Sequence, residues 1–249
     1  MAKIAAIWRH PIKSHGRESL ASVLLSAGQA LPWDRRWAVV HDNAHVDMDN
    51  PVWVPCQNFM IGTRIPALAG IWAALDEETG QVTLRHVDLG ALTFDPDTET
   101  PAFLDWVAPL CAVDRAMPTG IINLGTRGAT DTDYPSVTVM NMASHRAVET
   151  AMGQPLETER WRGNFWVEGL PAWQERDWIG HHVRIGSAVL LVREDVRRCQ
   201  HTAANPVTGQ RDADTLGTLE QNFGHRNFGV YAEIVESGLV NLDDKVELL

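Results

Sequence analysis

The residues best suited to chemistry lie at positions 197–202, where Cys199 follows Arg197 and Arg198. Residues 189–192 are apolar and predict a buried strand, while residues 205–209 carry a turn signal. Cys199 is therefore expected where a strand leaves the core and enters a polar loop. Guanidinium charge nearby favours the thiolate, which is the form that attacks electrophiles or binds a metal. The alternative is a buried, unreactive cysteine, as many free cysteines are.

Basic residues in other expected loops offer a second kind of chemistry. They are Lys13, Arg35, Arg162 and one of the two arginines before Cys199. If they meet in one pocket, they would bind an anionic ligand, because arginine forks match phosphate oxygens. A thiolate beside a phosphate site suggests a phosphorylated cofactor that carries a metal. The alternative is that these cations are solvated or paired with the many carboxylates of the chain.

Several familiar site patterns are missing from the sequence. It has no glycine-rich dinucleotide fingerprint, P-loop, G-x-S-x-G elbow or H-E-x-x-H pair. Three cysteines are too few to hold an iron–sulfur cluster. A zinc site built from Cys199, His201 and His225 remains an alternative, although its spacing matches no known zinc pattern.

Composition narrows the class of protein. The chain has 249 residues, 45% of them hydrophobic, and a net charge of −11, which argues against general binding of nucleic acids or anionic membranes. Three cysteines form no disulfide framework, so a reducing compartment, the cytoplasm, is expected. The sequence has neither a secretory signal pattern nor an apolar run of about 18 residues, so no membrane partner is expected.

The elements that must position these residues are mostly short strands. Strand patterns at 3–9, 18–25 and 37–40, and a hairpin over 71–86, predict a small antiparallel barrel or sandwich. We find no β-α-β alternation, which disfavours a Rossmann fold. Apolar spacing predicts a helix over 100–110, and residues 119–133 are expected to form a long loop. The prediction is a mainly β (α+β) fold with domains at 1–99 and 100–249, the second beginning with a helical linker near 100–111.

Several blocks of the sequence together resemble the MOSC domain, the C-terminal module of molybdenum cofactor sulfurases. They are residues 162–169, 178–180, 183–186, 198–209 and 228–231. Upstream, residues 10–14 and 34–37 resemble the N-terminal β-barrel that accompanies MOSC in amidoxime reductases and bacterial hydroxylaminopurine-resistance proteins. The resemblance covers nearly the whole chain. It implies a small N-terminal β-barrel packed on a MOSC β-barrel.

The resemblance also implies a cofactor and its site. The cofactor would be a molybdopterin-type molybdenum cofactor, with Cys199 as the metal ligand and a catalytic residue. The matching cofactor-binding positions are Lys13, Ser14, Arg35, Arg162, Asn164, Arg198 and Thr202. An active-site aspartate is implied near Pro135, where Asp133 is preferred to Asp131 as the catalytic residue. One departure from the family pattern is Gly163, which stands where the family usually has proline.

The implied activity is reduction of the N–O bond in small N-hydroxylated compounds. Some bacterial relatives append a cysteine-rich ferredoxin domain that this sequence lacks, so a separate electron donor is expected: a ferredoxin, a cytochrome b5-like protein or a flavin reductase. Two alternatives remain open. The chain could carry the cofactor or transfer sulfur without redox turnover, or it could be a β-barrel protein in which Cys199 is structural.

Overall fold

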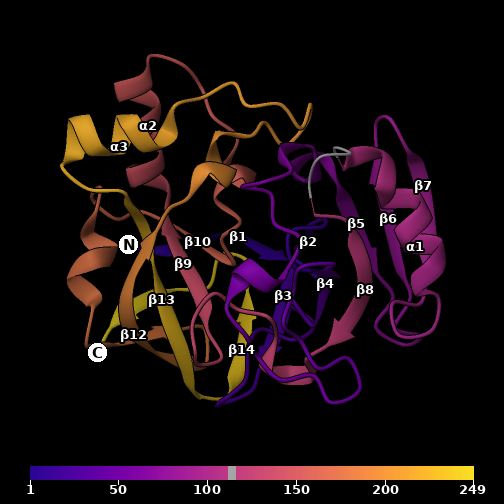
Figure 1. Cartoon of the computed structure of the whole chain (residues 1–249). Coiled ribbons are helices and arrows are strands. Elements are labelled where there is room, and N and C mark those ends of the chain that lie inside the picture. Colours follow the sequence, from indigo (N-terminus) through magenta and orange to yellow (C-terminus); the bar gives the residue numbers. More distant parts are fainter. Residues whose placement is uncertain (112–115) are drawn as a thin grey trace.

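The computed structural model describes residues 1–111 and 116–249, and strands dominate it (Figure 1). The fold is mainly β, as predicted. The largest sheet has eight strands in the order β15 (Val246–Leu248), β11 (His182–Ile185), β12 (Ala188–Arg197), β13 (Asn227–Glu236), β9 (Val137–Asn141), β10 (Phe165–Glu168), β1 (Lys3–Arg9) and β2 (Glu18–Leu20). Alternating apolar residues of these strands pack into one core, as in β11, where Val183 and Ile185 are buried and the residues between them are exposed.

One β-α-β unit interrupts this otherwise antiparallel sheet. Strand β9 leads into α2 (Met142–Met152) and then to β10, which pairs with β9 in parallel. The expectation that the chain has no β-α-β alternation is wrong for this segment. The unit is hard to recognise because about a dozen further residues with no strand pattern separate α2 from β10. Helices α2 and α3 (Thr215–Phe223) contact each other at one end of the sheet (Figure 1).

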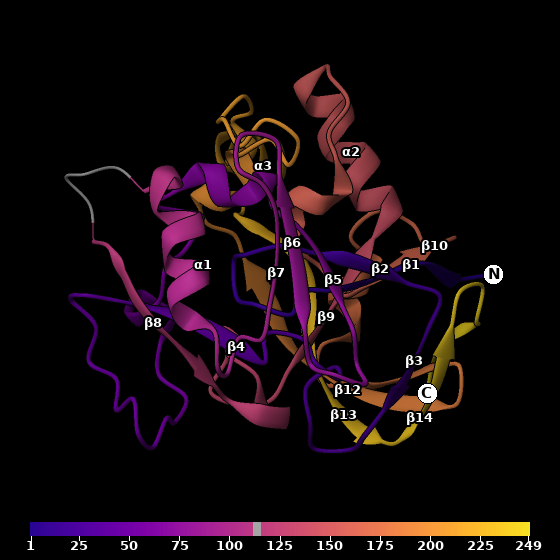
Figure 2. The ribbon, with the colours of Figure 1, turned by 90° about the vertical axis from the view of Figure 1, so that its right-hand side faces the viewer.

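Smaller sheets complete the molecule. Strand β4 (Trp37–His41) pairs with β8 (Pro118–Asn123), and β3 (Ser22–Leu25) pairs with β14 (Gly238–Asn241). Strands β5 (Trp72–Leu75), β6 (Val82–His86) and β7 (Gly90–Phe94) form a three-stranded sheet, which faces the viewer in Figure 2. Helix α1 (Thr100–Val107) lies against β7 and β8. A second core forms around Trp37, Leu84 and Phe103.

Short 3-10 helices connect these elements: η1 (Cys56–Asn58), η2 (Pro66–Gly70), η3 (Ala108–Leu110), η4 (Gly125–Arg127), η5 (Thr158–Trp161), η6 (Gln174–Trp178) and η7 (Gln200–Ala203). The predicted helix over 100–110 is confirmed as α1 followed by η3, and the hairpin over 71–86 is confirmed as β5–β6. The predicted loop over 119–133 is wrong at its start, because β8 occupies residues 118–123. Its β-branched Ile121 and Ile122 favour a strand.

Strand pairing crosses the boundary that we predict between residues 99 and 100. Strands β1 and β2 belong to the large sheet, β3 pairs with β14, and β4 pairs with β8. The loop that follows β1 is therefore held beside strands that lie more than 100 residues away in the sequence. No helix within residues 1–111 or 116–249 combines the length and the apolar character needed to cross a bilayer.

Candidate functional site

A cavity of about 550 Å³ lies where the loops of the N-terminal half meet strands β9, β12 and β13 and the segment just before β10. It brings together almost every site residue that the sequence predicts. The predicted residues that line it are Lys13, Ser14, Arg35, Arg162, Asn164, Arg198, Cys199 and Thr202. Asp133 does not line it, whereas Asp131 does. The geometry therefore favours Asp131 over the aspartate that we prefer from the sequence.

Cys199 stands between the end of β12 and η7, at a strand exit, as predicted. Its side chain is exposed and lines the cavity, so its sulfur is open to a ligand. The Thr63 hydroxyl donates a hydrogen bond to Cys199 Sγ, with 3.1 Å between Oγ1 and Sγ. Thr202 is buried, and its side chain stabilises the turn that carries Cys199. Its hydroxyl donates to the Cys199 carbonyl and forms a hydrogen bond with Thr215 Oγ1. Thr202 thus positions the cysteine backbone.

Lys13 is buried and lies on the loop after β1. Its ammonium group donates to the Ala129 carbonyl at 2.7 Å and to Asp131 Oδ1 at 2.5 Å. Loss of solvation would raise the pKa of Asp131, but the charges of Lys13 and Arg35 outweigh it and lower that pKa. Asp131 is therefore an ionised carboxylate at neutral pH, and its side chain remains 50% exposed because it faces the open cavity.

Three of the predicted residues have an unusual backbone. Ser14, Arg35 and Arg162 have φ angles of 63°, 50° and 49°, in the left-handed region that residues with a Cβ rarely adopt. Such conformations cost free energy and concentrate at functional sites, where the surrounding structure holds them. Here Arg35 donates from its backbone N–H to the His10 carbonyl and from its guanidinium to the Arg162 carbonyl. Two of the three residues, Arg35 and Arg162, are therefore tied to each other at the cavity wall.

Arg162 and Arg198 are charged groups without charged partners. Within the described residues neither forms an ion pair: Arg162 donates to the Gly16 carbonyl, and Arg198 donates to the Phe228 and Trp161 carbonyls. Burial, and then the like charges of Arg35 and Arg17, lower the pKa of Arg162, and burial lowers the pKa of Arg198. Both remain cations at neutral pH, because arginine does not lose its proton in proteins. An anion in the cavity would relieve this unfavourable arrangement.

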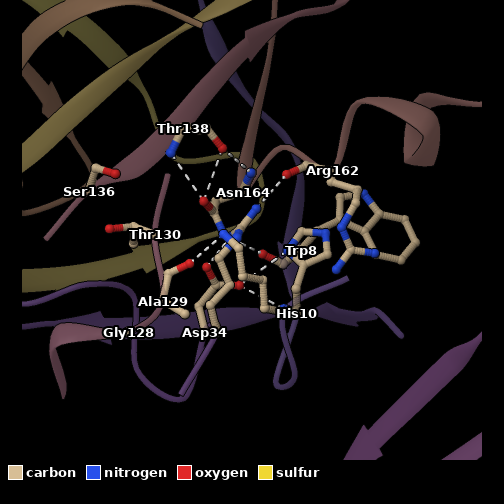
Figure 3. Close-up of polar contacts among 12 residues, drawn as sticks. Trp8, His10, Asp34, Gly128, Ala129, Thr130, Ser136, Thr138, Arg162 and Asn164 are labelled. Atoms are coloured by element: carbon tan, nitrogen blue, oxygen red, sulfur yellow. Dashed lines mark hydrogen bonds and ion pairs between the residues drawn. The ribbon is translucent and has the colours of Figure 1, made fainter. Parts of the chain in front are cut away.

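Asn164 borders the cavity, but the protein itself uses its amide (Figure 3). Its Oδ1 accepts hydrogen bonds from the backbone N–H and the hydroxyl of Thr138, and its Nδ2 donates to the Trp8 carbonyl. Asn164 is fully buried and ties β9 to β1 just before β10 begins. Its direct role is to hold the strands that form the cavity floor.

Cys56, Thr63 and Tyr231 are among the lining residues that were not singled out from the sequence. Cys56 and Thr63 lie in a stretch between β4 and β5 that has no recognisable motif. Tyr231 lies inside one of the blocks that resemble MOSC, residues 228–231. That resemblance is the signal that could have identified it as a candidate site residue. Burial, and then the charge of Asp131, raise the pKa of the Tyr231 phenol, so it stays protonated and can donate a hydrogen bond.

The geometry does not support a zinc site built from Cys199, His201 and His225. His225 packs against Trp173 and Phe223 and does not line the cavity that contains Cys199 and His201. Burial, and then the charges of Arg162 and Arg17, lower the pKa of His201 to about 3, so its imidazole is neutral at pH 7.

The charge of the lining contrasts with that of the whole chain. Three acidic residues line the cavity: Asp131, Glu194 and Asp195. Six basic residues line it: Lys13, Arg35, Arg160, Arg162, Arg197 and Arg198. This excess of cations stands in a protein of net charge −11. An anionic molecule that also offers a site for a soft sulfur ligand fits the volume, the charge and the exposed thiol of Cys199.

Known proteins resemble this chain along most of its length. A molybdenum cofactor sulfurase from Bombyx mori is 35% identical over 94% of the chain, and one from Anopheles gambiae is 38% identical over 30% of it. The chain spans 32% and 10% of these two proteins. The crystal structure of the YuaD protein from Bacillus subtilis shares the fold, with a TM-score of 0.50 at 14% identity, covering 99% of this chain and 94% of that one.

Two family models match consecutive parts of the sequence. The MOSC N-terminal beta barrel domain matches residues 1–103, and the MOSC domain matches residues 129–247. The second match contains Arg162, Arg198 and Cys199, and the first contains Lys13, Ser14 and Arg35. The cavity is thus built from both matched parts, and the chain belongs to the MOSC family.

Proposed function

We propose that the protein is a cytoplasmic oxidoreductase that binds a molybdenum cofactor of the molybdopterin type and reduces small N-hydroxylated compounds. The observation that carries the proposal is the exposed sulfur of Cys199 in the same cavity as two guanidinium groups that find no counter-ion among residues 1–111 and 116–249. The molybdenum cofactor sulfurases among its relatives support a connection to this cofactor.

Different side chains of the cavity would bind different parts of the cofactor. Arg162, Arg198 and Arg35 would hold the acidic groups of the cofactor, and Cys199 would bind its metal. When bound, the cofactor would supply the two-electron chemistry that removes oxygen from an N–OH group. Each N–O bond broken consumes two electrons and two protons and releases one water.

Protons and electrons reach this site by different routes. The Lys13 ammonium and the Tyr231 phenol are proton-bearing groups on the cavity wall, while Asp131 is ionised and would accept a proton or orient a donor. Electrons would come from a separate protein: a ferredoxin, a cytochrome b5-like protein or a flavin reductase.

The test replaces one sulfur at a time in protein produced in a host that makes the cofactor. We expect Cys199→Ser to lose molybdenum at least about tenfold, measured by elemental analysis, and to lose amidoxime reduction with a chemical reductant. Cys111→Ser is the matched control, because Cys111 lies in the second core, away from the cavity. Cys199→Ser protein that keeps its molybdenum and its turnover would refute the proposal.

A second candidate function is sulfur transfer or cofactor delivery without redox turnover. One observation favours it: Cys56 is a second exposed thiol in the same cavity, contributed by the other half of the chain. Sulfur transfer passes a sulfane sulfur from one thiolate to another, which needs two thiols within reach of one site. A protein that binds the cofactor, reduces no N-hydroxylated compound and activates a cofactor-deficient enzyme only when Cys56 is intact would favour this function.

A further inference from the structure

The segment from Ile61 to Thr63 lines the cavity beside Cys199, although it belongs to the N-terminal half and to no block of recognisable sequence. The Thr63 hydroxyl lies 3.1 Å from Cys199 Sγ and donates to it. Among the described residues, it is the one hydrogen-bond donor that the structure gives to this sulfur. The contact joins residues that are 136 positions apart in the chain.

Two further contacts hold Thr63 in this place. The guanidinium of Arg211, from the loop that follows η7, donates to the Thr63 carbonyl at 2.6 Å. On the other side, Gly62 lies directly against the His201 ring, and a Cβ at position 62 would come within 1.8 Å of His201 Nδ1. Only glycine permits this approach. The backbone on both sides of the hydroxyl is therefore fixed against the loop that carries Cys199.

We propose that Thr63 is a positioning residue that orients the Cys199 sulfur toward the cavity. A hydroxyl that donates to a sulfur ligand fixes the direction of that sulfur and limits how much electron density it shares with a metal. Partners of this kind around a metal ligand commonly change affinity or activity 10- to 100-fold. The role toward the metal rests on the proposed function, whereas the hydrogen bond itself does not.

The first measurement uses the full chain prepared without cofactor. Thr63→Val keeps the shape of the side chain and removes the donor, and Thr63→Ser keeps the donor. We follow alkylation of Cys199 by iodoacetamide at pH 7.5, quantified by mass spectrometry of its peptide, with Cys56 in the same sample as the internal reference. We expect Thr63→Val to react about threefold more slowly, because its Cys199 sulfur is no longer held in one orientation toward the cavity, and Thr63→Ser to stay near the wild-type rate.

The second measurement uses cofactor-loaded protein. Thr63→Val should shift the sulfur-to-metal absorption band, and Thr63→Ser should leave it in place. Equal alkylation rates in wild type and Thr63→Val would overturn the inference, and so would an equal loss in both variants, which would indicate packing instead of a hydrogen bond. Failure of the proposed function is distinguishable, because absence of N–O reduction leaves the alkylation measurement unchanged.

Discussion

Two polar regions beside the large sheet differ in the partners that they provide for their buried charged groups. Below α2, the Glu175 carboxylate is completely buried and accepts hydrogen bonds from Asn141 Nδ2 at 2.7 Å and from the Ser144 hydroxyl at 2.9 and 3.0 Å. Asn141 also donates to the Pro171 carbonyl, and Ser144 also accepts from the Trp173 backbone N–H. This cluster satisfies itself with protein groups and has no need of a ligand.

The cavity on the same sheet is not satisfied in this way. In the part of the chain that the structure describes, Arg162 and Arg198 have carbonyl partners but no carboxylate, and the Cys199 sulfur is open. The closed cluster is part of the fold, whereas the cavity carries charge that a bound anion would balance. Burial alone does not distinguish a structural polar group from one that binds a ligand. The distinction depends on whether the protein itself supplies all the hydrogen-bond and charge partners of that group.

The sharpest test of this comparison uses two arginines on either side of Trp161. Arg160 is buried and pairs with Glu157 and Asp212, both at 2.7 Å, whereas Arg162 pairs with no carboxylate of the described residues. We expect Arg162→Met to lower the molybdenum content at least about tenfold and to leave stability within about 0.5 kcal/mol of wild type. We expect Arg160→Met to lose about 2 kcal/mol in urea unfolding, because two carboxylates lose their partner, while the folded protein keeps its metal.

The opposite pattern would break the comparison. If Arg162→Met unfolds more easily and keeps its metal, Arg162 is structural and the cavity is not an anion site. Because both substitutions remove one positive charge and leave the same side chain, the change in net charge cannot account for a difference between them.

The Glu175 cluster offers the reciprocal test. Glu175→Ala removes the acceptor for two buried donors, so it should cost about 2 to 3 kcal/mol in the free energy of unfolding. Its molybdenum content per folded chain should match wild type, since none of the residues of this cluster lines the cavity. Urea denaturation followed by tryptophan fluorescence gives the first quantity, and elemental analysis of the purified protein gives the second. A metal-free but fully stable Glu175→Ala protein would contradict both expectations.

The sequence predicted the parts of the site that local pattern encodes. The strand exit at Cys199, the fold class and most of the cavity-lining cations followed from short apolar runs and from blocks that resemble MOSC. What it missed depends on tertiary contact. Thr63 and Cys56 reach the cavity only because the loop between β4 and β5 folds over it, and Asp131 was not separable from Asp133 by spacing alone. Asn164 shows the converse, since its position was right but its amide is used to join strands.

The two regions should also respond differently to acid, and the net effect is the smallest of those expected because His15 and Glu175 act in opposite directions. His15 is completely buried beside the Lys13 loop, and burial lowers its pKa to about 4. The unfolded chain takes up this proton near pH 6.5 and the folded chain does not, so His15 weakens the fold by about 2 kcal/mol between pH 7.5 and pH 5. Burial raises the pKa of Glu175, so acid protonates the folded state more readily there and offsets part of the loss.

Unfolding in urea at pH 7.5, 6 and 5 separates the two contributions. His15→Asn keeps a donor for the Lys13 carbonyl, which His15 Nδ1 contacts at 2.7 Å, and removes the titration, so its stability should fall less than that of wild type on acidification. Glu175→Gln removes the offsetting group, so its stability should fall more steeply. Parallel pH profiles for wild type and both variants would mean that neither group differs in proton affinity between the folded and unfolded chain. The contrast between the two regions would then rest on the hydrogen-bond partners alone.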